Sequence, residues 1–139
     1  MSKHEHAGAP SSQELLVELT DFLAVVATRA MYDEQPELWQ LGEQARAHTL
    51  EDFAHHFRVL ATLDEIVFTS HVQFCIDLFR QRSFPQQWLT DGWRHMAAVM
   101  ERELPPKVAE EAVRVLRQGV ADAGGEVPTA PATEAPADC

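Results

Sequence analysis

Apolar residues recur every three or four positions through the central part of this 139-residue chain, a period typical of amphipathic α-helices. The first helix is expected to begin at Ser11, where Glu14 can complete a capping box, and to run to about Tyr32. The side chains predicted to face inward from it are Leu15, Leu19, Phe22, Leu23, Val26 and Ala30.

Proline, glycine and aspartate separate the helices that follow. Gln35-Pro36 ends the first helix, and Asp64 is placed to cap a later one. The stripe predicted to face inward from the helix after Pro85 consists of Leu89, Trp93, Met96, Ala97 and Met100. The predicted segments are a short turn over PELWQL and helices over about 42–63, 65–82, 86–103 and 106–121.

The pattern predicts an all-α protein, because no run alternates like a strand and no Asn-Gly or Asp-Gly hairpin signal lies between β-branched stretches. Five to six helices with short connections favour a globin-like orthogonal helical bundle over a four-helix bundle. We expect a flexible N-terminal tail over residues 1–11, a helical domain over 12–121, and a disordered acidic Ala/Pro tail over 122–139.

Charge and composition restrict the class of partner. The net charge of −11 argues against nucleic acid and against an anionic membrane surface. No segment approaches the ~18 uninterrupted apolar residues of a membrane span, and the N-terminus carries no apolar signal core. Two cysteines do not make a disulfide framework. A cytoplasmic location is therefore expected.

Two histidines occupy positions where a helical core usually has leucine. His56 shares a face with Phe53, Phe57 and Leu60, and His71 shares one with Val67, Phe74, Cys75 and Leu78. An imidazole that faces a core is either held by a hydrogen bond or faces a ligand that needs a nitrogen. Asp52 lies one turn before His56 and could orient its ring in either case. Both interpretations stay open at this point.

His71 and Cys75 lie one turn apart on the next helix. With His56 opposite, the two imidazoles could bracket a flat macrocycle, and His71 would then be the metal ligand if the macrocycle is haem. A bilin would instead need a histidine or carboxylate near its ring nitrogens. Trp93 could line the wall of such a pocket, although core packing explains a tryptophan equally simply, as inert filling explains a buried cysteine.

A second polar set lies on the long central helix. His48, Asp52 and His55 stand at i, i+4 and i+7 and could bind a metal ion, but a solvated stripe is the more ordinary interpretation. The chain has no HExxH or CxxC motif and no nucleophile with an evident oxyanion hole, so we do not expect an enzyme.

Residues 35–120 resemble a helical domain that precedes cobalamin-binding domains in bacterial photoreceptor-like proteins. The residues that carry the resemblance are Pro36, Glu37, Leu38, Gly42, Arg46, Asp52, His56, Leu104 and Pro105. The resemblance implies a fold similar to globins and phycobiliproteins, and a bilin ligand, and it extends to small globins associated with bilin metabolism. This chain departs from the pattern in having His71 and Phe74 where Tyr and Trp are usual, and in lacking the cobalamin-binding domain.

The resulting hypothesis is a tetrapyrrole-binding sensor or pigment-handling protein with a biliverdin-type bilin or haem as cofactor. His56 and His71 are the chief predicted contacts, and the remaining predicted site residues are Asp52, His55, Cys75 and Trp93. A homodimer and a separate signalling or bilin-metabolism partner are compatible with this hypothesis. The alternative is a ligand-free, globin-like interaction or dimerisation module in signalling, in which the histidines are structural.

Overall fold

The computed structural model describes residues 9–128, which form five α-helices and one 3-10 helix and contain no strand. The predicted all-α bundle is confirmed. Its elements are α2 (Ser12–Glu34), η1 (Pro36–Leu41), α3 (Glu43–Leu60), α4 (Glu65–Gln81), α5 (Gln86–Glu103) and α6 (Pro106–Asp122).

Two of the helix starts follow directly from local sequence. The Ser11 hydroxyl accepts a hydrogen bond from the Glu14 backbone N–H at 3.1 Å, and the Glu14 carboxylate accepts one from the Ser11 N–H at 2.9 Å. This is the predicted capping box. Asp64 caps α4 by accepting from the backbone N–H groups of Ile66 and Val67 at 2.9 and 3.0 Å.

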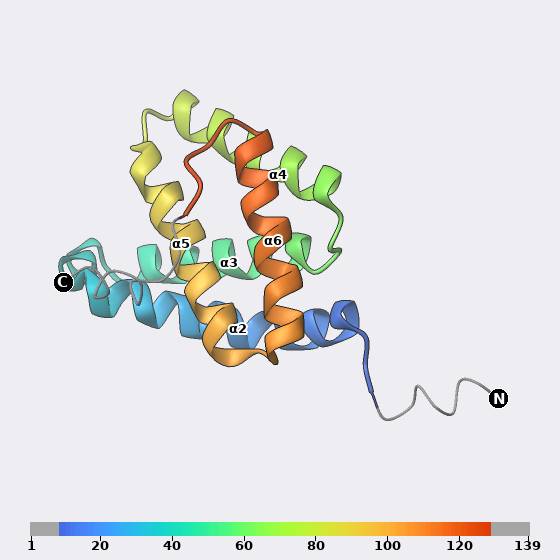
Figure 1. Cartoon of the computed structure of the whole chain (residues 1–139). Coiled ribbons are helices and arrows are strands. Elements are labelled where there is room, and N and C mark those ends of the chain that lie inside the picture. Colours follow the sequence, from blue (N-terminus) through green and yellow to red (C-terminus); the bar gives the residue numbers. More distant parts are fainter. Residues whose placement is uncertain (1–8, 129–139) are drawn as a thin grey trace, which may run out of the picture.

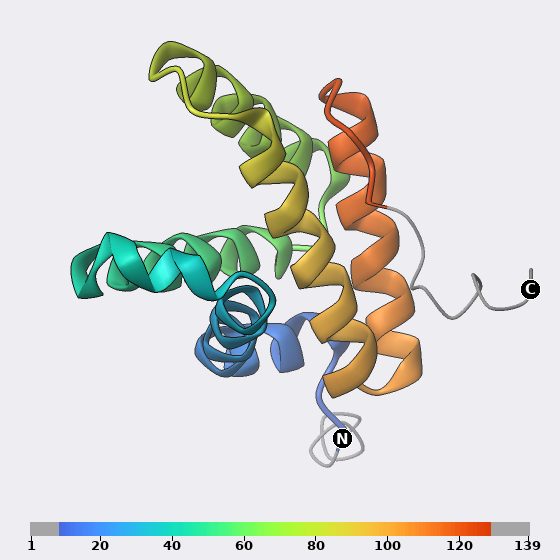
Figure 2. The same ribbon diagram turned by 90° about the vertical axis from the view of Figure 1, so that its left-hand side faces the viewer.

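Helices α5 and α6 run side by side in opposite directions, and α2 and α3 lie across them (Figure 1). Helix α2 packs against α3 and α5, α6 packs against both α4 and α5, and η1 lies against α2 and α3. A short turn over residues 61–64 joins α3 to α4, and Figure 2 shows the two helices diverging from that turn with α5 between them. The end of α3 and the start of α4 are therefore held close together.

The core confirms some predicted faces and corrects another. The predicted stripe of α5, including Trp93 and Met96, is buried throughout. On α2, however, Phe22 is 48% exposed, and the buried face is turned by about one residue toward Leu16, Leu23 and Ala27. The inward positions also include Thr20 and Thr28, whose hydroxyls donate to carbonyls one turn earlier and so need no other partner.

The first part of the predicted disordered tail, up to residue 128, is ordered in the structure. Residues 123–128 turn back from the end of α6, as Figure 1 shows, and the Gly125 N–H donates to the Val120 carbonyl at 2.9 Å. Ala123 and Pro128 are buried. The predictions for residues 1–8 and 129–139 lie outside the described residues. Within residues 9–128, no helix combines the length and the apolar character that crossing a membrane requires.

Helices α4 and α6 approach closely at Gly119, and this contact yields a test of the packing. A Cβ added at Gly119 would lie 2.7 Å from Cδ2 of buried Phe68 and 3.4 Å from the Thr69 backbone nitrogen. We expect Gly119→Ala to lower the free energy of unfolding by about 1–3 kcal/mol, since a well-packed core resists an added methyl group. Chemical denaturation measures this change.

The matched control is Gly92→Ala on α5. Its new Cβ would meet nothing closer than Phe53 at 3.9 Å, an ordinary contact. The gain in helix propensity should then stabilise the protein by up to about 1 kcal/mol. Equal effects of the two substitutions would show that α4 and α6 are not packed as described.

Candidate functional site

The structure brings His56, at the end of α3, against His71, at the start of α4. Nδ1 of His56 lies 2.8 Å from Nε2 of His71, and the ring centroids are 5.0 Å apart. Sγ of Cys75, one turn further along α4, lies 3.7 Å from the same Nε2 atom. Among residues 9–128, these three side chains form the one group whose metal-binding atoms all lie within 4.8 Å of one another.

A hydrogen bond between two imidazoles requires one ring to donate its N–H and the other to accept at an unprotonated nitrogen. Protonating both rings would place two positive charges side by side. Burial, together with the neighbouring His71 and His55, lowers the pKa of His56 to about 3. Burial, together with His55, lowers the pKa of His71 to about 4. The pair is therefore neutral at physiological pH.

Cys75 is a protonated thiol in this setting. Burial, together with the negative charge of Asp52, raises its pKa to about 12. A thiol of this kind reacts slowly with oxidants and alkylating agents, because the thiolate is the nucleophile. A metal ion is the partner that would remove its proton.

Aromatic side chains of the core pack against this cluster. Trp93 is only 2% exposed, and its ring lies 4.9 Å from that of His56. Phe68 stacks at a tilt 5.8 Å from His71. Trp93 thus packs in the core, against the inner side of the cluster. His55 and Asp52 are more exposed to solvent than His56, and the His55 ring lies 5.0 Å from that of His71.

Three sequence-based expectations need correction. His56 pairs with His71, at 2.8 Å, and not with Asp52, which the sequence allowed as its partner. Val67 and Phe74, assigned to a buried face with His71, are 43% and 61% exposed, because α4 diverges from α3 beyond the turn. The two imidazoles, which the sequence allowed on either side of a macrocycle, are in direct contact with each other.

The distance between the two imidazole nitrogens is shorter than a haem between them would require. Two axial nitrogens on opposite sides of a haem iron must lie roughly 4 Å apart with the macrocycle between them. The nitrogens of His56 and His71 are in direct hydrogen-bond contact at 2.8 Å. In this conformation the two rings therefore do not sandwich a flat ligand. The set of His48, Asp52 and His55 is likewise not among the close groups of metal-binding atoms in residues 9–128.

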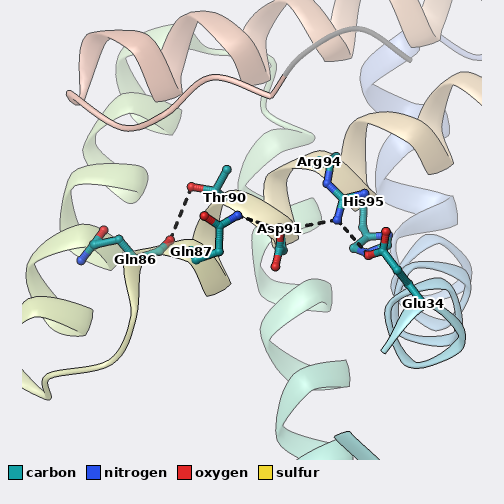
Figure 3. Close-up of polar contacts among 7 residues, drawn as sticks. All are labelled: Glu34, Gln86, Gln87, Thr90, Asp91, Arg94 and His95. Atoms are coloured by element: carbon teal, nitrogen blue, oxygen red, sulfur yellow. Dashed lines mark hydrogen bonds and ion pairs between the residues drawn. The ribbon is translucent and has the colours of Figure 1, made fainter. Parts of the chain in front are cut away.

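A separate polar cluster was not anticipated from the sequence. The Glu34 carboxylate, at the end of α2, accepts hydrogen bonds from Arg94 at 2.8 Å and from buried His95 at 2.9 Å, both on α5 (Figure 3). Arg94 also contacts Asp91 at 3.4 Å. Because about sixty positions separate Glu34 from its partners, no local motif could have revealed the contact. Its role is to hold α2 on α5.

Two surface hollows lie away from the histidines. One is lined by Ser12 and four charged residues of α6, and the other by side chains of α5, α6 and Val127. Neither is lined by a member of the His56–His71–Cys75 cluster. The chain matches no protein-family model, no curated protein and no solved structure. The resemblance to globin-like domains therefore stays a prediction.

The neutral imidazole pair predicts a pH-dependent stability in the metal-free protein. The histidines titrate near pH 6.5 in the unfolded chain but near pH 3 and 4 when folded. Between these values the unfolded state binds more protons, so their contribution to stability is complete above about pH 6.5 and is lost as the pH falls. Each contributes up to about 1.4 kcal/mol per pH unit, with the share of half-buried His71 reduced by solvent.

We therefore expect the free energy of unfolding to fall by about 2 kcal/mol more in the wild type than in a His56→Leu/His71→Leu variant between pH 6 and pH 5. Urea denaturation with chelator present measures this difference. The titration of His95 and of the carboxylates is common to both proteins and cancels. Parallel pH profiles for the two proteins would contradict the neutral, buried pair.

Proposed function

We propose that this domain binds a borderline or soft transition-metal ion, of the Zn²⁺ type, through His56, His71 and Cys75. The observation that supports this proposal is the convergence of two imidazole nitrogens and one thiol sulfur, from two helices, within 4.8 Å. Imidazole and thiolate favour zinc, copper and iron, whereas magnesium and calcium prefer oxygen ligands.

The distances between the donor atoms are close to those that a tetrahedral ion needs. Bond lengths of about 2.0–2.1 Å to nitrogen and 2.3 Å to sulfur imply nitrogen–nitrogen and nitrogen–sulfur separations of about 3.3 and 3.6 Å. The corresponding distances are 2.8 Å from His56 to His71 and 3.7 Å from His71 to Cys75. A shift of about half an ångström between α3 and α4 would bring the two imidazole nitrogens to the separation that a tetrahedral ion needs.

Binding requires little change in protonation. Because the two histidines are already neutral, they need only a tautomer that leaves Nδ1 of His56 and Nε2 of His71 free to coordinate. The Cys75 thiol loses its proton to solvent, so one proton is released for each ion bound. The ion would replace the hydrogen bond between the rings, which is the contact that now joins α3 to α4 at this point.

An ion bound in this way would cross-link α3 and α4, the two helices that diverge from the short turn. Metal occupancy would then control how firmly α3 and α4 are held together, which suits a metal-responsive binding domain better than an enzyme. In a three-ligand site the fourth position is open to water or to another side chain. In this proposal a metal ion, and not a macrocycle, lies between the two histidines.

Zn²⁺ titration of the full chain tests the proposal. The background should carry His4→Ala, His6→Ala and Cys139→Ser, so that the terminal histidines and thiol cannot bind the ion. We expect saturation at one equivalent and, at free Zn²⁺ a hundred times the Kd, a stabilisation of about 2.7 kcal/mol. His71→Ala and Cys75→Ala should each weaken binding by about a hundredfold or more, since each removes a direct ligand.

His48→Ala is the matched control, because it removes an exposed histidine of α3 that lies outside the cluster. It should leave the Kd unchanged. The absence of saturable binding, or equal affinity in the wild type and His71→Ala, would contradict the proposal and favour a ligand-free interaction module.

A tetrapyrrole is the second candidate, and one observation favours it. Val67 and Phe74 lie one turn before and after His71 on α4 and are 43% and 61% exposed. Together they form an apolar strip on which a flat pigment could rest, with His71 as its single nitrogen contact and His56 behind it. Haemin and biliverdin are therefore added to the same titration. A saturable absorbance change that is lost in Phe74→Ser but not in Cys75→Ala would favour this candidate over the metal ion.

A further inference from the structure

Each of the two helices that meet at the site carries two potential ligands one turn apart. His71 and Cys75 are spaced i, i+4 on α4, and Asp52 and His56 are spaced i, i+4 on α3. Side chains with this spacing lie on one side of a helix, one above the other. The two pairs therefore face each other across the α3–α4 contact, with His56 and His71 already in direct contact at 2.8 Å.

We infer that Asp52 is the fourth ligand of the metal site, and that the complete site consists of two helical i, i+4 pairs: Asp52 with His56, and His71 with Cys75. The inference rests on the proposed function and deepens it. The carboxylate of Asp52 is not among the atoms that lie within 4.8 Å of one another, so its side chain must rotate toward the ion. Asp52 is solvent-exposed, and this rotation displaces no core residue.

The charges of the proposed ligands fit a divalent ion. Asp52 supplies a carboxylate, and Cys75 supplies a thiol that a metal ion would ionise. A divalent cation between the two groups would neutralise both, and a carboxylate, a thiolate and two imidazoles balance a charge of +2.

His55 is the competing fourth ligand. Its ring lies 5.0 Å from that of His71, about the separation of two imidazoles on one tetrahedral ion. It follows His56 directly in the sequence, however, and adjacent positions of a helix point in directions about 100° apart, whereas positions four apart lie on one side. Asp52 lies on the same side of α3 as His56. The helix geometry therefore favours Asp52 over His55 as the fourth ligand.

The test measures the sulfur-to-cobalt charge-transfer absorption of the Co²⁺-loaded full chain, again in the His4→Ala/His6→Ala/Cys139→Ser background. Asp52→Cys would place a second thiolate on the ion, and the sulfur-to-cobalt charge-transfer absorption should become about twice as intense as in the wild type. The matched control is Glu51→Cys at the adjacent exposed position, which should leave the absorption unchanged. Asp52→Asn should weaken Co²⁺ binding about tenfold to a hundredfold, and Glu51→Gln less than about twofold.

Equal spectra for Asp52→Cys and Glu51→Cys would overturn the assignment while leaving the three-ligand site intact. A loss of affinity and a spectral shift in His55→Ala, with Asp52→Asn unchanged, would assign the fourth position to His55 instead. If the wild type shows no thiolate-to-cobalt absorption at all, the proposed function fails and this inference fails with it. Circular dichroism of the metal-free variants checks that these exposed substitutions preserve the fold.

Discussion

The hydrogen bond between His56 and His71 is the interaction on which this account depends. The two ring nitrogens are 2.8 Å apart, and burial keeps both rings neutral by lowering the pKa of each. A buried polar group is costly unless it is hydrogen-bonded, and here one nitrogen of each ring is paired with a nitrogen of the other. The same pair presents two unprotonated imidazoles at neutral pH, which is the state a metal ion requires.

The fold places this pair through a small number of local features. Asp64 caps α4 immediately after the turn that ends α3, so the last turns of α3 and the first turns of α4 must lie side by side. Trp93 of α5 and Phe68 of α4 then enclose the rings from the core. Beyond the site the two helices diverge, and the outer face of α4 stays open to solvent. A buried anchor next to an open face suits a binding site.

Much of the helical framework could be predicted from the sequence, because its determinants are local. The Ser11 capping box, the Asp64 cap and the inward stripe of α5 all follow from neighbouring residues. The facing of His56 and His71 could be anticipated from the apolar sides of two adjacent helices. The exposure of Val67 and Phe74 could not, because it depends on the angle between α3 and α4. The Glu34–His95 contact joins distant segments and has no local signal.

Scalar coupling in the ¹¹³Cd-loaded, ¹⁵N-histidine-labelled protein is the most direct test of the central claim, because it identifies the coordinating atoms individually. If the imidazole pair of the metal-free protein becomes the metal site, one ¹¹³Cd resonance should couple to Nδ1 of His56 and to Nε2 of His71, the atoms now joined by the hydrogen bond. A ¹¹³Cd resonance with no coupling to either nitrogen, while the two rings keep their metal-free shifts, would show that the pair is purely structural.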